Sequence, residues 1–109
     1  MSPALPILQG TLDVVILGAI SPKPIHGYGI ATGIEERSGG QLRLEDAALY
    51  QALHRLERQG YIEAEWGASD NNRRARFYTL TPAGRRRLAE QKSYWRRYVR
   101  AIDALLRAV

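Results

Sequence analysis

Side chains that can hydrogen-bond to nucleic acid recur at helical spacing between residues 44 and 60. Gln51, His54 and Arg58 lie three or four positions apart and therefore share one helical face. Amide, imidazole and guanidinium groups can hydrogen-bond to base edges or to phosphate oxygens. Three leucines occupy the opposite face of the same helix: Leu49, Leu53 and Leu56. The segment is therefore expected to pack on one side and to offer polar groups on the other.

Two further residues of this helix are candidates for the same contacts. Tyr50 is expected at the edge between core and solvent, where its ring can pack half-buried. Arg55, next to His54, is expected to point outward and to fork onto guanine or hold a phosphate. The alternative for Arg55 and His54 is a solvated surface pair.

A second group of candidates follows a turn signal at residues 70–72. Arg73, Arg74 and Arg76 lie where a basic hairpin can reach the minor groove of DNA or its phosphates. DNA contact is expected for Arg73 and Arg74. Arg76 can instead pair with a glutamate across the hairpin. The glutamates in question are Glu63 and Glu65.

The elements that hold these side chains can be placed from hydrophobic periodicity and turn residues. Helices are expected over about residues 12–20, 26–38 and 45–59. Gly60 ends the third helix, and period-two alternation follows at 61–66 and again at 76–80. Leu42 and Leu44 also alternate with a polar residue, which predicts a short third strand beside this wing. The order predicts a mainly α (α+β) fold, a winged helix-turn-helix.

A long helix is expected from about residue 82 to the end of the chain, because no strong breaker interrupts it. Its apolar residues recur every seven positions, from Leu88 through Trp95 and Ile102 to Val109. This spacing suits a seam against a second helix, so a homodimer is predicted. The predicted dimerisation residues are Leu88, Trp95, Val99, Ile102, Leu105 and Leu106.

The seam contains a candidate ligand site. In a symmetric dimer Trp95 would lie near its own copy or near the first helix of the other subunit, and paired aromatic faces can hold a planar ligand. Trp95 and Tyr98 are therefore the candidate ligand-binding residues for a small aromatic effector. The alternative is that both side chains simply pack in the core.

Composition sets the size and the charge of the molecule. The 109 residues, 45% of them hydrophobic, allow one modest core. The expected organisation is a winged-helix DNA-binding domain over residues 1–80 and a dimerisation helix over residues 81–109. The net charge of +5 is uneven, with five basic and nine acidic side chains in 1–72 but eleven basic and two acidic in 73–109. A basic surface attracts polyanions, although arginines also keep an exposed helix soluble.

Catalytic, metal-binding and membrane proteins are not expected. The chain has no cysteine, and its two histidines, His26 and His54, belong to different helices, so no metal site or cofactor is predicted. The glycines of segment 27–29 suit close helix packing, and no nucleophile motif or dinucleotide fingerprint occurs. The lack of a long apolar stretch and of a signal peptide predicts a soluble, cytoplasmic protein with no membrane partner.

Four segments carry a family resemblance. In chain order they are LQGTLDVVILGAI, HGYGI, ALYQALHRLERQGYIEAEW and RRARFYTLTPAGRRRL. Together they cover roughly residues 5–90, and they resemble the PadR-like transcriptional regulators, specifically the short members with one carboxy-terminal helix. The resemblance implies a winged-helix dimer on a palindromic operator in double-stranded DNA, with the Tyr50 hydroxyl touching the DNA backbone. It further implies repression as the usual outcome, with release by aromatic or phenolic ligands in some members.

Two positions depart from the usual pattern of that family. Ala48 stands where a serine or threonine is common, so the hydroxyl suited to a phosphate contact is missing. Gln51 stands where a proline is common, and its amide can hydrogen-bond to an adenine edge. An operator different from those of its relatives is therefore expected.

Two other functions compete with this interpretation. A winged helix can serve as a protein-interaction module, with the basic helix binding an acidic partner. The outward polar groups of the third helix argue against that module. A non-specific nucleic-acid binder is the other alternative, and the charge alone permits it.

Overall fold

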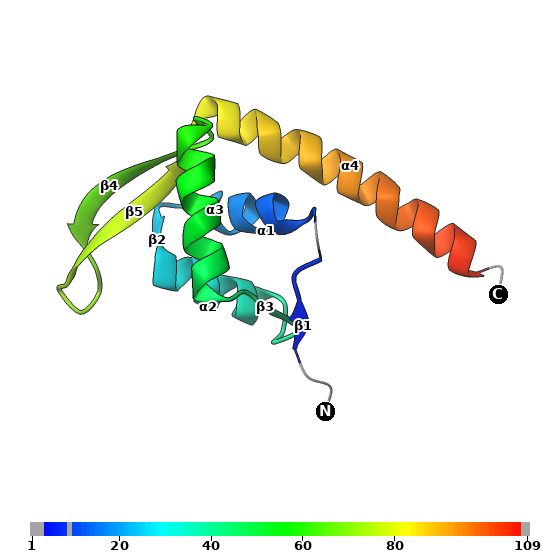
Figure 1. Cartoon of the computed structure of the whole chain (residues 1–109), viewed down its shortest axis with the longest axis horizontal. Coiled ribbons are helices and arrows are strands. Elements are labelled where there is room, and N and C mark those ends of the chain that lie inside the picture. Colours follow the sequence, from blue (N-terminus) through cyan, green and yellow to red (C-terminus); the bar gives the residue numbers. More distant parts are fainter. Residues whose placement is uncertain (1–3, 9, 108–109) are drawn as a thin grey trace.

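The protein builds a small helical core from which a hairpin and a long helix extend in different directions (Figure 1). The computed structural model describes residues 4–8 and 10–107, so Val109 lies outside the described part of the chain. The elements in chain order are β1 (Leu5–Pro6), α1 (Leu12–Ile20), β2 (Ile25–His26), α2 (Gly27–Arg37), β3 (Leu42–Arg43), α3 (Asp46–Arg58), β4 (Ile62–Ala68), β5 (Arg74–Leu80) and α4 (Pro82–Arg107). The predicted mainly α winged helix-turn-helix is confirmed.

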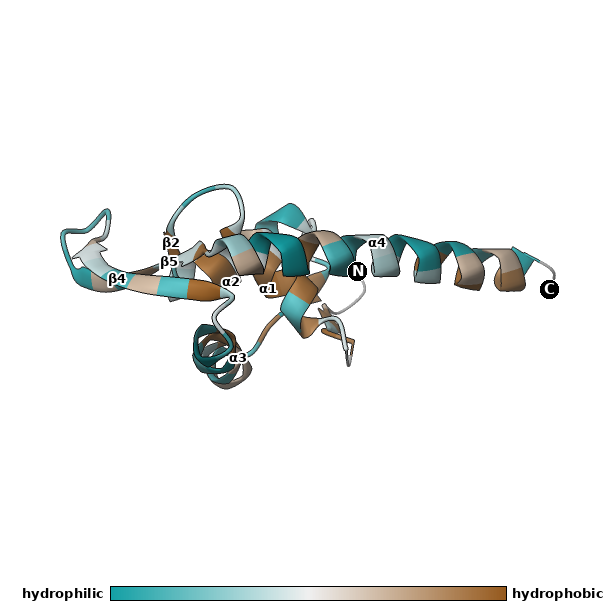
Figure 2. Cartoon of the chain, turned by 90° about the horizontal axis from the view of Figure 1, so that it is seen from above, coloured by the Kyte–Doolittle hydropathy of each residue, from teal (hydrophilic) through white to brown (hydrophobic). Residues whose placement is uncertain are grey.

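The core forms where the apolar faces of α1, α2 and α3 meet the inner face of the wing. Its fully buried large side chains are Ile16, Leu17, Ile20, Ile30, Leu49, Leu53, Leu56 and Ile62. The predicted apolar face of the third helix is confirmed, because Leu49, Leu53 and Leu56 all belong to this set. Burying each such side chain stabilises the fold by about 1.5–3 kcal/mol. Figure 2 shows α3 end-on, standing apart on one side of the molecule.

The end of α3 is fixed by its glycine, as predicted. Gly60 has a φ of 81°, and its N–H donates to the carbonyl of Glu57 at 3.0 Å. The next N–H, that of Tyr61, donates to the carbonyl of Leu56 at 3.0 Å. This pair of bonds is a Schellman motif, which needs a left-handed residue and therefore favours glycine. The chain consequently leaves α3 at a defined angle and enters the wing.

The wing is the antiparallel pair β4 and β5, joined through a turn in which Asn72 has a φ of 57°. Asparagine tolerates this left-handed conformation better than most residues. A third strand, β2, pairs with the outer edge of β5 and places Ile25 opposite Tyr78. The wing sheet is therefore ordered β2-β5-β4.

The expectation that Leu42 and Leu44 add a strand to the wing is wrong. β3 instead pairs in parallel with the amino-terminal strand β1, with Leu5 opposite Leu42. The N–H of Leu5 donates to the carbonyl of Gln41 at 2.7 Å. Alternation predicts which faces of a strand are buried, but it does not specify the neighbouring strand.

The start of α4 is fastened to the end of α3. The Thr81 hydroxyl accepts the Gly84 N–H at 3.0 Å, as expected for a helix cap, and donates to the carbonyl of Gly60 at 2.6 Å. Gly84 is buried with its Cα against the carbonyl of Tyr61, where a Cβ would overlap the backbone. The junction therefore holds α3, both wing strands and α4 at one point.

Leu88 lies in the core of its own chain, so its assignment to the dimer seam is wrong. Its side chain is only 5% exposed, because the first turns of α4 still lie against the domain. Farther along α4, the large apolar side chains become exposed, from Tyr94 onward. Despite this apolar stripe, none of the helices in the described part of the chain is apolar and long enough to span a membrane.

The tight junction predicts a strong effect of Gly84→Ala. The added methyl group would overlap the Tyr61 carbonyl, so the free energy of unfolding is expected to fall by about 1–3 kcal/mol in urea denaturation. Gly33→Ala in α2 is the matched control, because no heavy atom lies within 4 Å of its added Cβ. That variant should gain about 0.4–1 kcal/mol. Equal stability of the two variants would contradict the role of Gly84.

Candidate nucleic-acid interface

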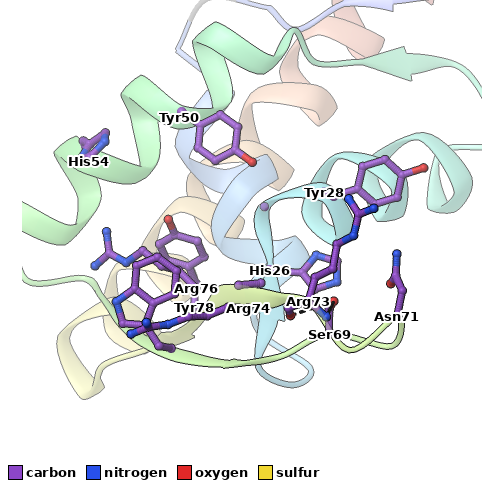
Figure 3. A pocket seen from close by; sticks show the side chains of 13 residues that line it. His26, Tyr28, Tyr50, His54, Ser69, Asn71, Arg73, Arg74, Arg76 and Tyr78 are labelled. Atoms are coloured by element: carbon purple, nitrogen blue, oxygen red, sulfur yellow. Dashed lines mark hydrogen bonds between the residues drawn. The ribbon is translucent and has the colours of Figure 1, made fainter.

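An open groove of about 620 Å³ lies between α3, the wing and the start of α2 (Figure 3). Five of the predicted DNA-binding residues line it together: Tyr50, His54, Arg73, Arg74 and Arg76. Gln51 and Arg58 are exposed on the same helix but do not line the groove. The structure therefore gathers side chains from two distant segments on one face.

Contact of Tyr50 with DNA stays a prediction, and the structure shows how its ring packs. Its side chain is 46% exposed, and its hydroxyl points toward the start of α2 (Figure 3). The ring lies over Gly27, where a Cβ would come within 2.6 Å of the Tyr50 hydroxyl. The expected close packing at segment 27–29 is thereby confirmed for Gly27, which leaves room for Tyr50 beside the groove.

The groove also contains residues of α2 that the sequence did not single out for binding. His26 caps α2, because its Nδ1 accepts the Gly29 N–H at 2.9 Å. Its ring meets the edge of Phe77 at a centroid distance of 5.4 Å, so this histidine is structural. Tyr28, in the first turn of α2, is 77% exposed and lines the groove. The sequence feature that could have pointed to Tyr28 was its position close to the start of the predicted second helix.

Arg55 does not point freely outward as expected. Its two terminal nitrogens donate to the two carboxylate oxygens of Asp13 on α1, at 2.7 and 3.0 Å. The hydrogen bond with Asp13, partly opposed by burial, raises the pKa of Arg55 above its ordinary value. Amphipathic periodicity predicts the face of α3 on which Arg55 lies, but it contains no information on which helix passes beside that face.

Arg76 pairs with Glu57 of α3 at 2.9 Å, so the expected partners across the hairpin are wrong. The register explains the difference, because it places Arg76 opposite Trp66. Side chains alternate along a strand, so Glu63 and Glu65 lie on the other face of the wing. The Glu57 pair ties the wing to the last turn of α3.

The wing also presents a stacked pair that sequence analysis missed. The guanidinium carbon of Arg74 lies 4.6 Å from the ring centroid of Trp66, whose side chain is 59% exposed. A cation over an indole ring is attracted to its face, and the N–H groups around the edge of the guanidinium stay available. Arg74 is thereby presented at the rim of the groove. This pair could have been predicted from the pairing of the two wing strands, which places Trp66 and Arg74 near each other.

Tyr78 of β5 also lines the groove, next to these arginines. Burial of its ring raises the pKa of the Tyr78 hydroxyl above its ordinary value, and the nearby charge of Arg76 opposes this shift. The phenol therefore stays protonated at neutral pH.

Within the described residues no cluster of histidine and carboxylate side chains could hold a metal ion.

A second cavity, of about 840 Å³, lies between α1 and α4. Both predicted ligand-binding residues line it, and the rings of Trp95 and Tyr98 stack at a centroid distance of 6.1 Å. Two buried polar atoms of its wall, Nε of Arg87 and Oε1 of Gln91, have no hydrogen-bond partner among the described residues. The cavity therefore offers aromatic faces to a ligand.

The fold and the groove define a winged helix-turn-helix protein with a long carboxy-terminal helix. The chain belongs to the transcriptional regulator PadR-like family, whose model matches residues 16–90. The family resemblance of its motifs is thus confirmed, and the protein is a transcriptional regulator of this family rather than an enzyme.

Individual relatives agree with this assignment. The chain is 34% identical over 94 residues to transcriptional regulator Rv3488 of Mycobacterium tuberculosis, covering 86% of this chain and 78% of that protein. The PadR-like regulator BC4206 of Bacillus cereus has a TM-score of 0.79 at 26% identity, with 91% and 94% of the two chains covered. The PadR of Bacillus subtilis, solved in complex with operator DNA, shares the fold with a TM-score of 0.67 at 24% identity, over 77% of this chain and 48% of that one.

Proposed function

We propose that this regulator is a cytoplasmic, homodimeric repressor that binds a palindromic operator through α3 and the wing. One observation supports it above all: Tyr50 and His54 of α3 and the arginines of the wing border the same open groove. A repressor of this kind acts by occupying its operator and excluding other proteins from the promoter. The same fold binds operator DNA in the PadR of Bacillus subtilis.

In this proposal α3 contacts the bases. Gln51 and His54 are exposed on its outer face, and Arg58 is exposed in its last turn. A helix with its side chains is about 10–12 Å wide, which fits a major groove about 12 Å wide. The Gln51 amide can bond in a bidentate manner to adenine, and Arg58 can bond to guanine or a phosphate. Tyr50, at the edge of the groove, would hold a backbone phosphate.

The wing supplies the contacts to phosphates. Arg73 and Arg74 are exposed, and neither forms an ion pair within the described residues. Arg76 contributes less, because Glu57 already holds its guanidinium. Phosphate contacts fix the register of a protein on DNA and contribute affinity without reading sequence.

The proposed dimer forms along α4. Its distal half exposes an apolar stripe of Trp95, Ile102, Leu105 and Leu106, with Val99 half-buried between them. A second copy of α4 would cover this stripe, and its two-fold symmetry would match a palindromic operator. The two copies of α3 would then enter grooves about 34 Å apart.

The cavity beside Trp95 is the proposed effector site. The stacked rings of Trp95 and Tyr98 favour a planar ligand. Because residues of both α1 and α4 line the cavity, a ligand there can favour dimers whose two α3 helices misfit the operator. Release from DNA then follows from the difference in affinity between the two arrangements.

DNA binding is tested with a duplex that the wild-type protein selects from a random pool, and with a scrambled duplex. The wild-type protein should prefer the selected duplex by at least about 1,000-fold. Arg74→Ala should weaken both complexes by about tenfold and reduce the salt slope by about 1, because it removes a phosphate contact. Fluorescence anisotropy at several salt concentrations measures both quantities. Arg100→Ala, an arginine of α4 outside the groove, is the control; equal losses in the two variants would argue against the wing contact.

The dimer seam predicts that Ile102→Asp dissociates the protein. A carboxylate placed in the apolar stripe would be desolvated without a partner, so sedimentation equilibrium should return the mass of one chain where the wild type returns two. Arg100→Asp places the same side chain on the opposite face of α4 and should leave the dimer intact. A monomeric wild-type protein at micromolar concentration would rule out the seam.

The effector site is tested with the planar aromatic anion 8-anilinonaphthalene-1-sulfonate. Wild-type protein should enhance its fluorescence saturably and should release the selected duplex as the probe binds. Trp95→Ala should abolish the enhancement, whereas Trp66→Ala should retain it, because Trp66 lies on the wing. Enhancement that persists in Trp95→Ala would place the probe elsewhere.

A further inference from the structure

The contact between Arg55 and Asp13 differs in kind from the rest of the interface between α1 and α3. It is a fork, with both carboxylate oxygens engaged at 2.7 and 3.0 Å, and the two side chains are 37% and 20% exposed. The remaining core contacts of α3 are made by apolar side chains such as Leu49 and Leu53. Apolar packing is non-directional, whereas an arginine–carboxylate fork fixes orientation as well as distance.

Arg55 lies one helical turn after Gln51 and next to His54 on α3. Holding its guanidinium against α1 therefore limits rotation of α3 about its own axis. A functional contact needs its side chains held within about 10–20° of the productive geometry. Rotation of α3 would move Gln51 and His54 away from the base edges while leaving them exposed.

The charge of Arg55 matters as much as its position. An unpaired arginine beside the outer face of α3 would attract any phosphate, and such contacts add affinity without sequence information. The Asp13 carboxylate neutralises this charge and occupies its hydrogen-bonding fork. Asp13 would itself repel phosphate if Arg55 were absent. The two side chains therefore present no net charge to DNA only when both are present.

We infer that Asp13 and Arg55 determine sequence specificity, by fixing the orientation of α3 and by keeping Arg55 from binding phosphate indiscriminately. Arg55 is thus a positioning residue and not a base contact. The inference rests on the DNA-binding function proposed above, and it concerns how well that function distinguishes one duplex from another.

The pair also connects α3 to α4, through α1. Asp13 lies on α1, which packs against α4 as well as against α3. Its neighbours Thr11 and Val14 line the cavity between α1 and α4. A displacement of α1 is therefore passed to α3 through a directional contact.

Asp13→Asn tests the inference, because it keeps the shape of the side chain and removes its charge. The preference for the selected duplex over the scrambled one should fall about tenfold, the discrimination carried by one base contact. The slope of log affinity against log salt on the scrambled duplex should steepen by about 0.9, because freed Arg55 neutralises one more phosphate. Asp103→Asn, the same change on α4, should alter neither quantity.

The double variant Asp13→Asn with Arg55→Met separates the two effects of the pair. Its salt slope should return to the wild-type value, because the unmasked charge is gone. Its preference for the selected duplex should stay low, because α3 is still not held. A purely structural role would change the melting temperature without changing the salt slope.

The outcomes distinguish this inference from the function on which it rests. A wild-type protein without sequence preference would overturn both the proposed function and the inference about Asp13 and Arg55. A wild-type protein that discriminates, together with a folded Asp13→Asn variant of equal preference and equal salt slope, would overturn the inference alone. If circular dichroism shows that Asp13→Asn does not fold, Arg55→Lys replaces it, because lysine keeps the charge but cannot form the fork. Unchanged discrimination in Arg55→Lys would equally overturn the inference.

Discussion

The arrangement of this molecule depends on one small junction where α3, both wing strands and α4 meet. The Thr81 hydroxyl bridges the carbonyl of Gly60 and the N–H of Gly84, and the Thr81 N–H donates to the carbonyl of Tyr61 at 3.1 Å. These bonds use backbone groups that have no partner within their own helices. The angle of the wing and the direction of α4 relative to α3 are consequently set by residues that do not line the groove.

From that junction the chain continues in two parts, one that has a buried core of its own and one whose apolar side chains are exposed. The core extends along α4 only to Leu88. Beyond it the helix is held by its own backbone bonds, and most stability of protein helices comes instead from packing of an apolar face. An exposed stripe that includes Ile102 and Leu106 is therefore costly in a single chain. Folding of this half of α4 and association with a second copy are expected to be one process.

Local signals predicted most of the fold, and distant contacts account for what was missed. The stop at Gly60 and the cap at Thr81 depend on residues close in sequence, so both were predictable. The partner of Arg55 lies 42 residues away, and the strand that pairs with β3 comes from the amino-terminal arm. Leu88 fits a heptad, but a heptad position does not reveal whether its neighbour belongs to the same chain. Five residues of the candidate groove were predictable from the sequence, whereas Tyr28, Trp66 and the ion pairs required the tertiary structure.

Those pairings divide the arginines of the candidate DNA-binding surface into two groups. Arg55 and Arg76 are neutralised by carboxylates of the same chain, whereas Arg74 is stacked on Trp66 with the edge of its guanidinium available. Positive charge available to phosphates is therefore concentrated on the wing, and the middle of α3 offers mainly neutral hydrogen-bonding groups. Such a division separates affinity, which phosphates supply, from specificity, which base edges supply. A regulator built in this way can bind DNA strongly through the wing without binding every sequence equally through α3.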